Sequence, residues 1–203
     1  MIPITTKIRN VLRGLTKRWG PSSFKRKLWD KEYACGNWDH CENTADDEVY
    51  GFVEKYCRNG SILDLGCGSG NTGNELALSS YRSYTGVDIS HVAVDKAARR
   101  SEKAGRADKN QYLQSDILLF VPQQQHDVIL FRESINNVPQ LKLKATLIRY
   151  SQYLTDSGVF VVRISKDATR RFAEIAAWLE ANFRVVEKFS TPRTSGAFII
   201  VFR

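Results

Sequence analysis

Residues 62–70 of this 203-residue chain read Ile62-Leu63-Asp64-Leu65-Gly66-Cys67-Gly68-Ser69-Gly70. This stretch has the pattern of a short apolar strand that ends in an acid and is followed by glycines at alternate positions. Glycine tolerates a positive φ and lacks a Cβ, so the backbone of such a loop can approach a ligand closely. A helix that begins after the loop offers free N–H groups in its first turn. The stretch therefore predicts a strand, a ligand-binding loop and a helix.

Strand-like and helix-like segments alternate outward from this stretch. Helices with ten or more residues between strands predict parallel pairing through right-handed crossovers. We therefore predict a doubly wound, mostly parallel α/β sheet with helices on both faces and an antiparallel terminal hairpin. Strands are expected at 61–65, 83–87, 111–113, 127–131, 158–164, 185–190 and 197–202, and helices at 46–56, 70–79, 92–103, 141–154 and 168–182.

Acidic side chains follow two further strands at the same edge of the predicted sheet. In open α/β sheets, ligands bind beyond the carboxyl ends of the strands, beside the first strand. Asp88 ends the second strand, 22 positions after Gly66, where a carboxylate can accept hydrogen bonds from both hydroxyls of a ribose. Asp116 follows the third strand, where it could meet an adenine amino group while Ile117 supports the ring.

Three runs together resemble one protein family: DLGCGSG at 64–70, GVDIS at 86–90 and SDI at 115–117. They are similar to the class I, Rossmann-like S-adenosylmethionine-dependent methyltransferases, of the type that modifies small molecules and sugars. The resemblance covers residues 46–203. It implies a seven-stranded sheet with the last strand inserted antiparallel, S-adenosylmethionine as cofactor, and methyl transfer as the activity.

The resemblance also implies how the cofactor is held. Backbone and side chains after the first strand would surround its methionine part, the acid of the second strand would take the ribose, and the next residues would enclose the adenine. In that order the expected residues are Asp64, Gly66, Cys67 and Gly68; Asp88; and Ile89, Asp116 and Ile117.

The segment after the fourth strand, 131–137, bears on the methyl acceptor. It lacks the acid or Asn, two prolines and aromatic with which enzymes of this class grip the amino group of a base. Glu133 is the candidate catalytic group, because it would lie at the carboxyl end of its strand and could take a proton from an acceptor hydroxyl. It could instead orient the cofactor or hold the loop. The adjacent Arg132 is a further cofactor-binding candidate.

Residues 29–44 are aromatic and polar and directly precede the fold. They resemble the amino-terminal lid of small-molecule and sugar-modifying members of the family, in which an aromatic closes over the cofactor. Tyr33 and Trp38 are therefore expected at the cofactor, although both could simply cap the domain. His40 is a possible base that nothing else supports. The expected organisation is an arm at 1–28, a lid at 29–44 and a methyltransferase domain at 45–203.

The net charge of +8 belongs to the arm. Residues 1–31 hold nine basic side chains and one acid, whereas charges in the rest of the chain cancel. Apolar residues recur at spacings of three and four over 4–19, as in an amphipathic helix. Such a helix suits peripheral contact with an anionic membrane; alternatively it packs on the domain. An acceptor carried on a lipid would fit the first case.

The sequence lacks the features that would indicate a membrane span, secretion or a metal site. No run approaches the roughly 20 apolar residues of a membrane span, and no secretory signal is evident, so we expect a cytoplasmic protein, peripheral at a membrane if the arm binds one. Cys35, Cys41, Cys57 and Cys67 have neither paired spacing nor disulfide density, so reduced thiols are expected. Zinc at Cys35, His40 and Cys41 matches no common spacing, and no metal site is predicted.

Three other functions compete with methyl transfer to a small-molecule or glycosyl acceptor. Residues 68–73 also fit GxGxxG, the pattern of nicotinamide cofactors, but that register ends the strand near Cys67 and leaves Asp64 as a costly buried acid. An RNA-associated methyltransferase, or a non-catalytic S-adenosylmethionine-binding protein, could use the basic arm to contact phosphates. The balanced charge of the domain makes nucleic acid the weaker partner.

Overall fold

The computed structural model describes residues 4–39, 42, 44, 46–165, 169–191 and 196–203. Within them, seven strands form one sheet in the spatial order β3-β2-β1-β4-β5-β7-β6. Only β7 runs antiparallel to its neighbours, β5 and β6. The strands are β1 (Ser61–Leu65), β2 (Ser83–Asp88), β3 (Asn110–Gln114), β4 (His126–Arg132), β5 (Leu154–Ser165), β6 (Val185–Ser190) and β7 (Ala197–Phe202).

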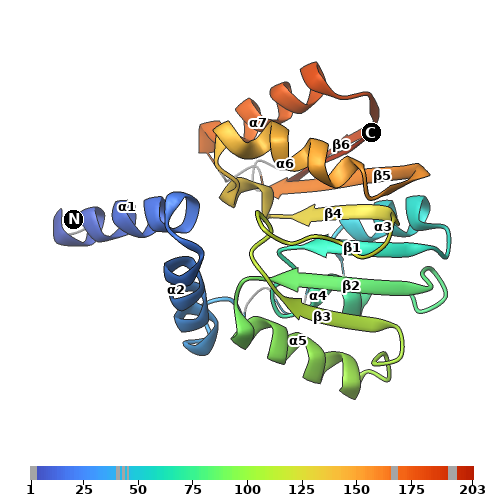
Figure 1. Ribbon diagram of the computed structural model, residues 1–203, viewed down its shortest axis with the longest axis horizontal. Helices are drawn as coiled ribbons and strands as arrows, with labels where there is room; N and C mark the ends of the chain where they lie inside the picture. Colours follow the sequence, from blue (N-terminus) through green and yellow to red (C-terminus); the bar gives the residue numbers. More distant parts are fainter. Residues whose placement is uncertain (1–3, 40–41, 43, 45, 166–168, 192–195) are drawn as a thin grey trace.

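Helices cover both faces of this sheet (Figure 1), so the predicted doubly wound, mostly parallel architecture with a terminal antiparallel hairpin is confirmed. The helices are α1 (Ile4–Trp19), α2 (Ser22–Ala34), α3 (Val49–Cys57), α4 (Asn71–Glu75), α5 (His91–Lys103), α6 (Gln140–Ser151) and α7 (Thr169–Asn182), and a 3-10 turn, η2, spans Ile135–Asn137.

The central strands are apolar throughout because they are buried on both faces. Successive side chains alternate between two cores. Leu63 of β1 and Ile129 of β4 join the core beneath α6 and α7. Ile62 and Val128, one position earlier in each strand, join the core beneath α3. The sheet is thus a rigid support whose strand ends have fixed positions.

The helix expected at 70–79 is shorter than predicted, and the reason is tertiary. After α4 the chain turns extended at Leu76. The carbonyl oxygen of Leu76 accepts a hydrogen bond from Arg106 (2.6 Å), and the amide of Ala77 donates to Glu54 (2.7 Å). Partners distant in sequence thus satisfy the backbone groups that a longer helix would have paired.

Both amino-terminal helices lie at the sheet edge towards which the arrowheads of β1, β2 and β4 point, and α1 extends away from the sheet (Figure 1). α2 packs against α5. It runs through position 28, where a boundary between arm and lid was expected. Among the described residues, no helix has both the length and the apolar character that a membrane crossing requires.

Replacing Ile129 by alanine tests the core assignment. Because this side chain is fully buried between β4 and the helices above it, we expect Ile129→Ala to lower the free energy of unfolding by about 2–5 kcal/mol, measured by urea denaturation. The matched control is Leu141→Ala, since Leu141 is 86% exposed; its effect should stay within about 0.5 kcal/mol. Equal losses in both variants would contradict the assignment.

Candidate active site

The loop after β1 folds back tightly on β2. The amides of Gly66 and Cys67 both donate to the carbonyl oxygen of Val87, at 2.7 and 3.0 Å. Gly66 and Gly68 have φ of 86° and 54°, which glycine adopts readily. A Cβ on Gly66 would lie 2.4 Å from Cβ of Ser134. The loop therefore needs glycine for its conformation and for its packing.

Asp64 supports this loop from below. Its side chain is only 1% exposed and accepts a hydrogen bond from the Tyr84 hydroxyl at 2.6 Å. Burial raises the pKa of Asp64 to about 6, and the hydrogen bonds from Tyr84 and Thr72 oppose that rise. Asp64 is thus a buried acid that is paired, so the cost expected of an unpaired acid in this strand does not arise. Asp64 does not line the pocket described below.

Asp88 connects the end of β2 to the glycine loop. Its Oδ2 accepts from the amide of Gly68 (3.0 Å), and its Oδ1 accepts from the amide of Ser90 (2.9 Å). Burial raises the pKa of Asp88 to about 6, although the amides of Ser90 and Gly68 favour the charged form. A carboxylate oxygen has two lone pairs, so each oxygen can still accept one hydroxyl of a ligand.

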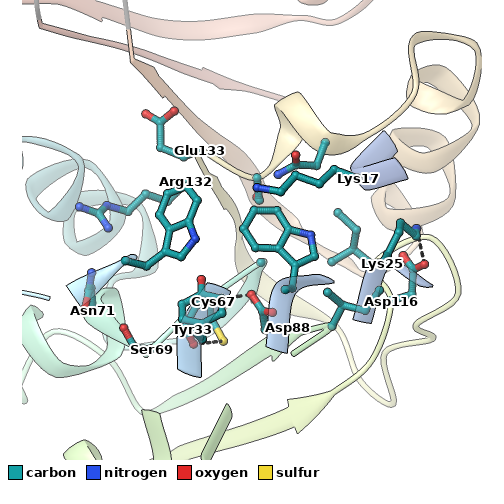
Figure 2. Close-up of a pocket in the computed structure, with 18 of the residues that line it drawn as sticks. Lys17, Lys25, Tyr33, Cys67, Ser69, Asn71, Asp88, Asp116, Arg132 and Glu133 are labelled. Atoms are coloured by element: carbon teal, nitrogen blue, oxygen red, sulfur yellow. Dashed lines mark hydrogen bonds and ion pairs between the residues drawn. The ribbon is translucent and has the colours of Figure 1, made fainter. Parts of the chain in front are cut away.

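Asp116 joins the site to α2. Its Oδ2 receives Lys25 Nζ at 2.5 Å, drawn dashed in Figure 2, and the hydroxyl of Ser22 at 2.7 Å. Its Oδ1 accepts from the amide of Leu118 at 3.0 Å. Burial raises the pKa of Asp116, but these donors outweigh it and hold the pKa below its usual value. Oδ1 retains a lone pair that faces no other protein donor in the described structure.

Glu32 of α2 holds together the segments that cover the site, which are α1, α2 and the residues up to Trp38 and are called the roof below. It is buried, and its carboxylate receives Arg13 Nε (2.6 Å), Lys17 Nζ (2.9 Å) and Trp38 Nε1 (3.0 Å). Lys17 Nζ also lies 3.7 Å from the centroid of the Trp29 ring, a cation–π contact. One buried acid thus brings α1, α2 and the following segment together over the strand ends.

The residues at the end of β4, Arg132 and Glu133, line another side of the site. Glu133 has a φ of 61°, an uncommon value for a side-chain-bearing residue and one often found at functional sites. Its carboxylate pairs with Arg163, and burial raises its pKa although Arg163 opposes this. Arg132 is held by Asp47 Oδ2 at 2.7 Å. Figure 2 shows the Glu133 carboxylate turned away from Asp88.

A single pocket collects these groups (Figure 2). All but one of the residues expected at the site line it, the exception being Asp64. Those brought together are Tyr33, Trp38, Gly66, Cys67, Gly68, Asp88, Ile89, Asp116, Ile117, Arg132 and Glu133. His40 and Cys41, considered as a base and as part of a zinc site, lie outside the described residues. Among the described residues, no cluster of His, Cys, Asp or Glu could hold a metal ion.

The pocket has further lining residues that we did not predict from the sequence. Ser69, Leu118 and Ser134 adjoin expected residues in the chain, and Asn71 and Asn137 lie within four positions of one, so proximity in the sequence was a usable signal for all five. Trp29 begins the segment read as a lid. For Lys17 and Lys25 nothing in the periodicity indicated a pocket, because their positions depend on pairing with Glu32 and Asp116.

The position of the glycine loop also distinguishes between the two cofactors considered, S-adenosylmethionine and a nicotinamide cofactor. β1 ends at Leu65, as the methyltransferase reading requires, and not near Cys67, where the nicotinamide register would end it. The GxGxxG run at 68–73 extends into α4, so Gly73 is a helical residue.

Comparisons with known proteins agree with this geometry. Residues 58–194, more than half of the chain, match a family model described as a methyltransferase domain. Among curated proteins, the chain is 28% identical over 120 residues to a 27-O-demethylrifamycin SV methyltransferase of Amycolatopsis mediterranei. It is 29% identical over 102 residues to a sterol 24-C-methyltransferase of Gibberella zeae. These matches cover 56% and 50% of the chain, and only 44% and 26% of the relatives.

Solved structures show the same fold. The N-methyltransferase NodS of Bradyrhizobium japonicum, in complex with S-adenosylhomocysteine, superposes with a TM-score of 0.67 at 17% identity, over 88% of this chain and 97% of that one. At that identity the likeness bears on the fold alone. With the family model, the sheet order and the glycine loop in agreement, the chain belongs to the Rossmann-like methyltransferase-domain family.

Proposed function

We propose that the chain transfers a methyl group from S-adenosylmethionine to an oxygen or nitrogen of a small-molecule or glycosyl acceptor. The observation that carries this proposal is the meeting, in one pocket, of the glycine loop with the carboxylates of Asp88 and Asp116. Rifamycin and sterol methyltransferases among the relatives support a small-molecule acceptor. The first match is an enzyme whose name specifies an oxygen acceptor.

The residues present fit the cofactor. A Cβ on Gly68 would lie 2.7 Å from the Tyr33 hydroxyl, so the absence of a side chain at Gly68 lets Tyr33 pack directly on the loop at the pocket. Asp88 would accept both ribose hydroxyls on its remaining lone pairs, and the free lone pair of Asp116 would accept from the adenine amino group. Ile89 and Ile117 would enclose the ring. When bound, the cofactor supplies an electrophilic methyl group on a sulfonium.

Glu133 is the candidate base for a hydroxyl acceptor. Burial raises its pKa, which makes the carboxylate a better proton acceptor near neutral pH. Its pairing with Arg163 restrains the carboxylate, so a turn towards the acceptor requires that this pair loosen. A role in alignment alone is the competing possibility, since methyl transfer depends strongly on orientation.

Ligand-induced stabilisation tests the cofactor assignment. A ligand that binds only the native state adds roughly 2.7 kcal/mol at about 100 times its dissociation constant. At that concentration we expect S-adenosylhomocysteine to raise the midpoint of thermal unfolding by about 5–10 °C, and Asp88→Ala to lose most of that increase. An equal increase in wild type and variant, or none in either, would contradict the assignment.

The pH dependence of S-adenosylhomocysteine binding should follow the titration of Asp88. Only the ionised carboxylate accepts both hydroxyls, and its pKa in the free protein is about 6. Affinity should therefore be constant above that pH and fall about tenfold between pH 7 and pH 5, measured by calorimetry. Asp88→Asn should bind weakly with a flat profile. Asp64→Asn should keep a pH-dependent profile, shifted to lower pH, because Asp64 lies outside the pocket but its charge contributes to the raised pKa of Asp88.

Glu133→Gln separates base catalysis from support of the loop. Loss of a general base should lower kcat about 100-fold or more with a hydroxyl acceptor, while the thermal shift with S-adenosylhomocysteine stays at the wild-type value. A kcat within about threefold of wild type would assign Glu133 to the loop alone.

A further inference from the structure

α1 has an apolar face that nothing in the described part of the chain covers. The side chains of Leu12, Leu15 and Trp19 are 58%, 52% and 53% exposed, and their spacings of three and four residues place them on one side of the helix. Phe24, in the first turn of α2, is 63% exposed. Isolated exposed apolar residues are ordinary, but several on one helix face mark an interaction site.

Ion pairs determine which face of α1 is outward. Arg13 and Lys17, four positions apart, both pair with Glu32 of α2, and they lie on the side of the helix opposite to Leu15. Rotating α1 to bury its apolar face against the domain would break both pairs and leave the buried Glu32 carboxylate without its cations, which is costly. The apolar face is therefore held outward.

The outward charge of the arm is positive. The acids within residues 1–34 are Asp30 and Glu32. Glu32 is buried, and Asp30 is turned towards α5, where it accepts from the Ser90 hydroxyl at 2.7 Å and pairs with His91 at 2.9 Å. Exposed basic side chains remain on the outside of α2: Arg26, Lys27 and Lys31. Cations thus accompany the exposed apolar groups without competing carboxylates.

We propose that the outer face of the arm, formed by Leu12, Leu15, Trp19 and Phe24 with the exposed cations of α2, docks on an anionic bilayer surface. Apolar side chains would enter the headgroup boundary while the cations meet acidic lipids. An anionic bilayer fits better than nucleic acid. Nucleic-acid phosphates would attract the cations but would not provide an apolar phase in which the apolar side chains could be buried. A second copy would bring two arms of like charge together.

The docking face and the pocket share α1, because Lys17 on its inner face lines the pocket. A bilayer on the outer face would thus hold the roof of the site at the membrane surface, where a lipid-linked glycosyl acceptor would be presented. The docking does not depend on the proposed methyl transfer, so the two can fail separately.

The test is sedimentation of the full chain with phosphatidylcholine vesicles, with and without phosphatidylglycerol. We expect the anionic vesicles to bind at least about tenfold more tightly, with the affinity falling as salt rises. The double variant Leu12→Glu/Leu15→Glu should lose that binding. Its matched control is Leu78→Glu/Ile148→Glu, which changes two apolar residues of similar exposure, 42% and 47%, outside both the arm and the pocket and should bind as wild type does.

The proposal is overturned if both double variants bind the vesicles equally, if anionic vesicles are not preferred, or if nothing binds. Salt-dependent retention of RNA that the arm variant leaves unchanged would also overturn it. A wild-type dimer in light scattering that Leu12→Glu/Leu15→Glu dissociates would overturn it as well. An unchanged thermal shift with S-adenosylhomocysteine in both variants shows that the fold and the cofactor site are intact.

Discussion

The amides of Gly66 and Cys67 share one acceptor, the carbonyl oxygen of Val87, and the pocket depends on this pair of hydrogen bonds. They tie the loop after β1 to the end of β2, which brings the Gly68 amide onto Asp88. Buried beneath the loop, the hydrogen bond from the Tyr84 hydroxyl to Asp64 joins β2 to β1. The parallel sheet aligns these ends, and only glycine can complete the turn at such close approach.

Above the glycine loop and the strands, ion pairs close the site. Charged groups of α1 and α2 pair with each other and with the domain: Glu32 of α2 binds Arg13 and Lys17 of α1, and Asp116 binds Lys25 of α2. Ion pairs thus hold α1 and α2 over the site, whereas apolar packing holds the sheet beneath them. Such pairs need both partners, because removing one leaves a buried charge uncompensated.

This division explains how much the sequence could predict. The strands, their order of alternation and the acids at their ends follow from periodicity, and the structure has β6 and β7 at the bounds expected. The short α4 could not be foreseen, because Arg106 and Glu54 end it from elsewhere in the fold. Nor could the places of Lys17 and Lys25, since helix docking is set by side-chain pairing rather than by pattern.

We place the cofactor between the glycine loop and the acids that end or follow β2 and β3. A crystal structure of the chain grown with S-adenosylhomocysteine would test this placement. We expect the ribose hydroxyls on Asp88 and the adenine between Ile89 and Ile117, with its amino group at Asp116. Density for the ligand elsewhere, or a ribose that contacts neither oxygen of Asp88, would contradict it.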